Sequence, residues 1–136
     1  MRAGKWLLAV LLALPATAWA GDVACNPDGN QMQLNACAGD AFEQADAELN
    51  RVYGEVRRSL AGDTLALQRL RDAQRLWVQL RDADVEARYP VPDGEDYRMH
   101  HGSMYPLLVL SARAEATRAR TAWLRSHFLE REEGQL

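Results

Sequence analysis

The sequence has few of the residues on which enzyme chemistry usually depends. Its 136 residues include two cysteines and three histidines. It contains no glycine-rich phosphate loop, and no His-x-x-x-His or Glu-x-x-His spacing that would place metal ligands on one face of a helix. Fold class alone does not exclude catalysis. We nevertheless expect a protein that is not an enzyme, has no cofactor and holds no metal.

Helix breakers are also scarce, because no proline occurs between residues 28 and 89. Helices are therefore predicted over 31–60 and 64–88, with Asp28 or Asn30 capping the first and Asp63 capping the second. Gly62 suits the left-handed position that ends a helix. After Tyr89-Pro90 stops the second helix, Ser103 is the expected cap of a third, which reaches about residue 128.

Apolar residues recur at helical spacing in all three segments, and each helix therefore has a predicted inner stripe. In the first helix the stripe is Phe42, Ala45, Leu49, Val52, Tyr53, Val56 and Leu60. In the second it is Ala66, Leu70, Ala73, Trp77 and Leu80. In the third it is Leu107, Leu110, Ala114, Thr117, Thr121, Leu124 and Phe128. The fold class is therefore all-α, a small antiparallel three-helix bundle.

The connection at Gly62 is so short that the first two helices should be antiparallel neighbours. Folding back at this point predicts an Asp46–Arg81 ion pair and an Asn50–Gln74 contact on either side of Trp77, with Tyr53 nearby. An acid–base cluster of Asp46, Gln74, Arg81 and Asp82 is the alternative interpretation. We favour a structural network, because an arginine lowers the pKa of a nearby carboxyl.

Long hydrophobic runs are absent beyond the first twenty residues. Residues 1–20 resemble a signal peptide, with Arg2 and Lys5 before an apolar run and Ala18-Trp19-Ala20 as the cleavage site. The run is too short for a permanent membrane span. Residues 21–136 then form a single exported domain, periplasmic or secreted. A lipoprotein anchored at Cys25 is less favoured, because Asp22 stands where a lipidation signal needs an aliphatic residue.

Positive charge is in deficit once the signal peptide is removed. Loss of Arg2 and Lys5 leaves 14 basic residues against 19 acidic ones, a net charge of −5. An acidic surface disfavours nucleic acid and attracts a basic partner at long range.

The two cysteines, Cys25 and Cys37, both lie in the exported part. In an oxidising compartment, thiols this close are expected to form one disulfide, which would pin the N-terminal segment to the first helix. A redox or metal-binding pair is the alternative, although it would favour Cys-x-x-Cys spacing.

The stretch from 90 to 102 is rich in breakers, and a loop of this length is usually functional or mobile. It contains Met99-His100-His101, which with Met104 could hold copper. Adjacent histidines are common without metal, so this interpretation ranks low. Trp123 is expected on the outer side of the third helix, alone or within a contact surface.

Several separated motifs together resemble the LprI lysozyme inhibitor family over most of the mature chain. They are Cys25, Asn35-Ala36-Cys37-Ala38, Ala45-Asp46, Leu49-Asn50-x-x-Tyr53, Ala73-Gln74-Arg75-x-Trp77, Arg81-Asp82-Ala83 and, on the third helix, Arg113. Members of that family commonly carry a second cysteine pair. Here Val85 stands at one of its positions, and no cysteine occurs from 97 to 113.

The resemblance implies inhibition of a basic cell-wall hydrolase such as lysozyme, by blocking its active-site cleft. The candidate partner-binding residues are Asp93, Glu95, Asp96, Tyr97 and Trp123. A non-inhibitory structural or chaperone-like envelope protein is the alternative, for which an apolar patch around Trp123 would be the discriminating feature. Copper binding is the third-ranked alternative.

Overall fold

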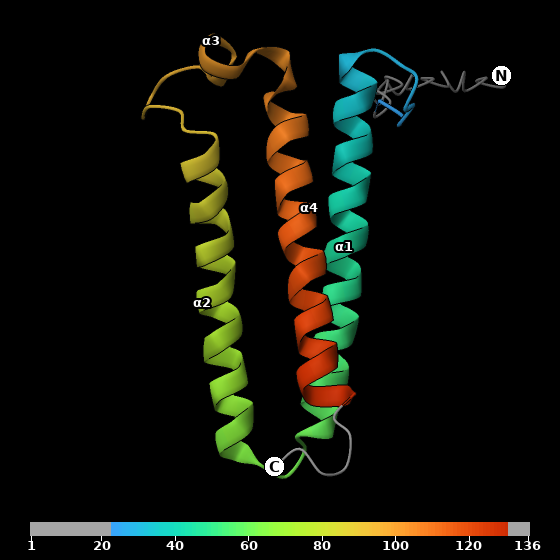
Figure 1. Ribbon diagram of the computed structural model, residues 1–136, viewed down its shortest axis with the longest axis vertical. Coiled ribbons are helices and arrows are strands. Elements are labelled where there is room, and N and C mark those ends of the chain that lie inside the picture. Colours follow the sequence, from blue (N-terminus) through green and yellow to red (C-terminus); the bar gives the residue numbers. More distant parts are fainter. Residues whose placement is uncertain (1–22, 131–136) are drawn as a thin grey trace, which may run out of the picture.

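The computed structural model describes residues 23–130, and all the regular secondary structure in this part of the chain is helical (Figure 1). Its long helices are α1 (Gln31–Ser59), α2 (Thr64–Arg88) and α4 (Tyr105–Leu124). Between α2 and α4 lie the short helix α3 (Tyr97–His101) and the 3₁₀ turn η1 (Gly102–Met104), and α4 continues into the π-helical segment η2 (Arg125–Leu129). The predicted fold class is confirmed. The predicted signal peptide lies outside the described residues.

Local side-chain chemistry sets the helix ends. Asn30, not Asp28, caps α1, because its side chain accepts from the Gln33 amide while the Gln33 side chain accepts from the Asn30 amide. Gly62 has a φ of 100°, which L side chains rarely adopt. Asp63 then caps α2 by accepting from the Ala66 amide at 2.9 Å. The short connection at Gly62 forms as predicted.

The closest packing in the molecule is between α1 and α4, which run side by side along their length. Small buried residues of α4, among them Ala114, Thr117 and Thr121, allow this approach. They face a buried stripe on α1 consisting of Ala38, Ala45, Leu49, Val52 and Val56. The stripes predicted for these two helices therefore hold in outline.

The second helix, α2, packs more loosely and mainly against α4, so the expected close pairing of α1 with α2 is wrong. Leu70 joins the cluster of Leu49, Val52, Val56 and Leu124 near the Gly62 turn. At the other end of α2, Val85 packs on Val109 and Ala112. Two apolar clusters thus attach the ends of α2, and polar contacts fill the middle.

The inner stripe predicted for α2 is only half right. Leu70 is buried and Trp77 is partly buried, but Ala73 is exposed and Leu80 keeps 59% of its surface exposed. The cause is rotation of the helix: Leu70, Gln74, Trp77, Arg81 and Val85 face inward. Leu76 and Leu80 consequently lie on the outer side of the bundle.

The stretch after α2 is more ordered than its breakers suggested. Asp96 caps α3 by accepting from the Arg98 amide at 2.9 Å. Ser103 does not cap α4, because η1 leads directly into that helix. The backbone carbonyl of Ser103 instead accepts a hydrogen bond from the Asn35 side chain of α1 at 3.1 Å. Pro106 occupies the first turn of α4, where its missing amide costs no hydrogen bond.

Cys25 and Cys37 form the predicted disulfide, which excludes the free-thiol redox or metal pair in this state. The bond ties the segment before α1 to the second turn of that helix. No helix formed by residues 23–130 combines the length and the hydrophobicity that a membrane span requires.

Candidate functional site

The middle of the bundle is held by Arg81, whose side chain is only 9% exposed. Its guanidinium donates to Asp82 at 3.0 Å and to the Thr117 hydroxyl of α4 at 3.4 Å. The same group lies 5.4 Å from the ring centre of Phe42 on α1 and 5.3 Å from that of Trp77. Arg81 of α2 therefore contacts both α1 and α4 in the middle of the bundle, between the two apolar clusters that hold the ends of α2.

The predicted Asp46–Arg81 ion pair and Asn50–Gln74 contact between α1 and α2 are wrong. Asp46 accepts from Asn50 on its own helix at 3.1 Å, and neither reaches α2. Asp82 is the acid that faces Arg81, and it also lies 3.3 Å from Arg113 of α4. The acid thus bridges two arginines from different helices. Tyr53 packs against the apolar cluster near Gly62.

Gln74 also finds its partner on α4, where its side-chain oxygen accepts from Arg120 at 3.1 Å. The Arg120 guanidinium lies between two indoles, 5.7 Å from the centre of Trp77 and 4.7 Å from that of Trp123. Burial lowers the pKa of Arg120. Phe42, Arg81, Trp77, Arg120 and Trp123 therefore alternate as aromatic and cation across the bundle, a contact type that gains strength when desolvated.

Sequence reasoning did not single out Arg120. The signal that could have found it is the seven-residue interval from Arg113, which equals about two helical turns and puts both guanidinium groups on one face of α4. That face of α4 lies toward α2. There Gln74 accepts a hydrogen bond from Arg120, and Asp82 forms an ion pair with Arg113.

This arrangement is suited to holding helices together. Asp82 lies within 3.3 Å of guanidinium groups on two helices, Arg81 of α2 and Arg113 of α4, and so links α2 to α4. No group of three or more potential metal ligands gathers within residues 23–130.

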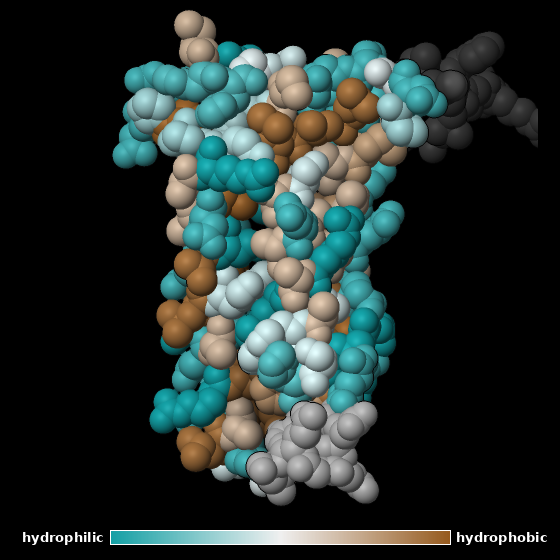
Figure 2. All heavy atoms as spheres, in the orientation of Figure 1, coloured by the Kyte–Doolittle hydropathy of each residue, from teal (hydrophilic) through white to brown (hydrophobic). Residues whose placement is uncertain are grey.

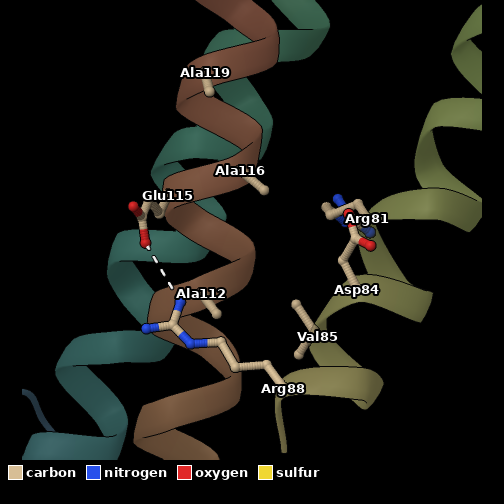
Figure 3. A pocket seen from close by; sticks show the side chains of 8 residues that line it. All are labelled: Arg81, Asp84, Val85, Arg88, Ala112, Glu115, Ala116 and Ala119. Carbon is tan, nitrogen blue, oxygen red and sulfur yellow. Dashed lines mark ion pairs between the residues drawn. The ribbon is translucent and has the colours of Figure 1, made fainter.

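Alongside the network, α2 and α4 border an open pocket of about 270 Å³ with an alanine floor formed by Ala112, Ala116 and Ala119 (Figure 3). Arg88 and Glu115 approach each other across it at 3.9 Å.

The predicted acidic loop residues Asp93, Glu95 and Asp96 are all exposed at the end of the bundle that carries α3. Glu95 lies 2.6 Å from His100. The Arg98 amide, and then the Arg98 charge, lower the pKa of Asp96. Close by is a polar pocket of about 320 Å³, lined by Glu86, Tyr89, Pro90, Val91, Asp93 and Tyr105. Sequence reasoning missed Glu86, whose position on the last turns of α2 brings a further carboxylate to this end.

Aromatic stacking holds the acidic end in place. Tyr97 stacks on Tyr105 at 4.8 Å between ring centres, and His101 stacks on Tyr105 at 5.3 Å. The His101 ring also contacts the Pro90 carbonyl at 2.9 Å. These contacts tether the chain between α2 and α4.

Trp123 does not share a surface with the acidic loop. It lies near the far end of α4, about eighteen residues or 27 Å along the helix from Tyr105. Its side chain is 43% exposed and stacks on His127 at 4.5 Å. The five candidate partner-binding residues therefore form two separate surfaces.

The candidate copper ligands do not converge. The Nε2 atoms of His100 and His101 contact Glu95 and the Pro90 carbonyl, and their ring centres are 6.4 Å apart. Met99 is 83% exposed. Copper would have to displace both of these contacts to bind.

Comparisons with known proteins give a family match and a relative of similar length. The family described as lysozyme inhibitor LprI matches residues 23–124. An uncharacterized protein of Rhizobium meliloti (strain 1021) is 36% identical over 141 residues, covering 92% of this chain and 94% of that protein. No solved structure matches. Because the family match spans most of the chain, this protein belongs to the LprI lysozyme inhibitor family.

Proposed function

We propose that this protein is an exported inhibitor of a basic cell-wall hydrolase, namely lysozyme, and that it acts by blocking the active-site cleft. The observation that carries the proposal is the family match over residues 23–124. The disulfide supports an oxidising compartment, periplasmic or extracellular.

An inhibitor of this kind needs a surface and no chemistry of its own. Lysozymes of the animal type are basic proteins with two carboxyl groups in an open cleft. The end of the bundle around α3 presents exposed acids, and Glu86 and Asp93 line a pocket together with Tyr89 and Tyr105. Carboxylates beside tyrosine rings suit a lysine or arginine side chain. This end is therefore the proposed inhibitory surface.

The first experiment follows lysozyme clearing a peptidoglycan suspension, with and without residues 21–136. We expect dose-dependent slowing that weakens between about 10 mM and about 150 mM salt, because the Debye length falls from about 30 Å to about 8 Å. No slowing at large molar excess would contradict inhibition of this hydrolase.

A pair of charge-matched variants tests the surface. Asp93→Asn with Glu95→Gln removes two charges from the acidic end and should weaken inhibition about five- to tenfold. Asp40→Asn with Glu43→Gln removes two exposed charges from α1 and should leave inhibition within about twofold. Equal losses from both pairs would indicate a net-charge effect and reject this surface.

A second candidate function, a non-inhibitory envelope binding protein, is favoured by one observation. Trp123 borders an apolar pocket of about 310 Å³, whose other lining residues include Leu70, Ala73 and Phe128. Such a pocket suits an apolar side chain of another exported protein. Under this alternative, residues 21–136 would not slow lysozyme at large molar excess, whereas slowing that Trp123→Ala abolished would instead place the inhibitory surface at this end.

A further inference from the structure

The outer face of α2 carries hydrophobic residues that nothing in the bundle covers. Leu76 and Leu80 are 60% and 59% exposed, and Ala73 and Ala83 are exposed beside them. Figure 2 shows hydrophobic residues along the outer edge of α2. Of the nine large hydrophobic residues exposed in the described chain, Leu76 and Leu80 lie about one helical turn apart on this face, with the two alanines on the same side.

The four residues Ala73, Leu76, Leu80 and Ala83 follow one another at intervals of three, four and three. This is the a/d spacing of a coiled-coil seam. The order Ala, Leu, Leu, Ala also reads the same in both directions, with its centre at residue 78. When two copies of such a helix run antiparallel, Leu76 of each lies opposite Leu80 of the other, and Ala73 lies opposite Ala83. Every seam residue then meets a partner of suitable size.

Charge at the end of the seam favours the same orientation. Arg69 is exposed and lies four residues before Ala73 on the same a/d line. In the antiparallel pair it lies opposite residue 87 of the other copy, next to the exposed carboxylate of Glu86. Antiparallel pairing also opposes the helix dipoles.

We propose that the outer face of α2 binds the same face of a second copy, forming an antiparallel two-fold dimer centred at residue 78. A self-complementary patch of this kind is what an isologous interface requires. The α2 seam, defined as Ala73, Leu76, Leu80 and Ala83, is short, so the dimer should be weak and depend on concentration.

The test is sedimentation equilibrium of residues 21–136 from about 10 µM to about 1 mM. We expect a monomer–dimer equilibrium that Leu80→Lys weakens at least about tenfold. Val78→Lys is the matched control, because Val78 is 36% exposed at the centre of the same helix but lies about 160° around it from both Leu76 and Leu80. A monomer throughout this range, or equal weakening by Val78→Lys, would overturn the proposal.

Cysteine cross-linking tests the register even if Leu80→Lys fails to fold. Residues 73 and 83 are about 15 Å apart along α2, so in the antiparallel dimer each lies far from its own copy. Ala73→Cys and Ala83→Cys proteins should therefore form an interchain disulfide when mixed and not when oxidised separately, because disulfide formation needs Cα atoms within about 7 Å. Cross-linking of either protein alone, or none in the mixture, would contradict this register.

Discussion

At the scale of single residues, the arginines that face inward determine how the helices are joined. Arg81 is nearly buried, yet it has a carboxylate, a hydroxyl and two aromatic rings around it, so its desolvation is offset by several contacts. Arg120 is less enclosed and has Gln74 and two indoles. Guanidinium suits both sites, because its plane stacks on aromatic rings while its edge donates hydrogen bonds.

Arg81→Ala should therefore destabilise the protein by about 2–3 kcal/mol, because it opens a cavity and removes the contacts to Asp82 and Thr117. Asp82 keeps Arg113 as a partner, which limits the loss. Urea unfolding followed by circular dichroism measures the change.

Arg75→Ala is the control, because Arg75 is 71% exposed and pairs only with Asp72 of its own helix, at 3.4 Å. Its effect should stay within about 0.5 kcal/mol. If the two variants lost equal stability, Arg81 would not have the central role described here.

At the scale of elements, the helices differ in how firmly they are held. Close packing of small residues joins α1 to α4, whereas α2 is attached by an apolar cluster at each end and polar contacts in the middle. Near the α3 end, Val85 is buried against Val109 and Ala112. Apolar packing and the Tyr97–Tyr105 stack thus hold this end of the bundle.

The remaining disulfide should stabilise the domain without being needed for its helices. Cys25→Ser with Cys37→Ser should lower the free energy of unfolding by about 3 kcal/mol, since the bond restricts the unfolded chain over a separation of 12 residues. Far-ultraviolet circular dichroism should change little, because the bond closes only the segment before α1.

Reductant provides the control for the disulfide. It should reproduce the stability loss in the native protein and have no effect on the double serine variant, since the sequence has only these two cysteines. A large loss of helical signal in that variant would show instead that the bond is required for α1 to form.

At the scale of the whole molecule, surfaces of different chemistry occupy different places. Exposed acids and a tyrosine-lined pocket lie at the α3 end, the α2 seam runs along one side, and Trp123 borders an apolar pocket toward the other end. Glu48 contributes to closing the bundle, because it accepts from Arg125 beyond α4 and from Arg51 of α1, both at 2.7 Å.

Those two interactions give the whole protein a specific response to acid. Hydrogen bonds from Arg51, and then from Arg125, lower the pKa of Glu48 to about 2 from 4.5. A pKa lowered by folding means that the stabilisation is complete above the unfolded value and is lost as pH falls toward the folded one. The difference in melting temperature between native protein and Glu48→Gln should thus be constant above about pH 5 and shrink between pH 4.5 and about 2.

Glu43→Gln is the control for this measurement, because Glu43 is exposed on the same helix and forms no ion pair with any residue of the described range. At neutral pH, Glu43→Gln should not lower the melting temperature as Glu48→Gln does. A melting difference for Glu48→Gln that persisted unchanged at pH 2 would show that lost packing, not charge, destabilises the variant.

The sequence by itself determined the three long helices, the turn between α1 and α2 and the disulfide, because these depend on local signals; it did not predict α3 or the start of α4. Gly62 and Asp63 specify the turn between α1 and α2 whatever the tertiary packing, because one suits the end of a helix and the other caps the next. The scarcity of proline leaves helix as the favoured state on both sides of this turn. The inner stripes of α1 and α4 were predictable for the same reason, since helical spacing decides which side chains share a face.

Only the tertiary structure decided which helix each polar residue meets. A short turn makes antiparallel packing of α1 on α2 reasonable, but the small residues of α4 allow it to approach α1 more closely and so displace α2. Gln74 and Arg81 therefore bond to α4, and Asp46 pairs within its own helix. Spacing along one helix shows which residues share a face, whereas the choice of facing helix depends on competition among all three.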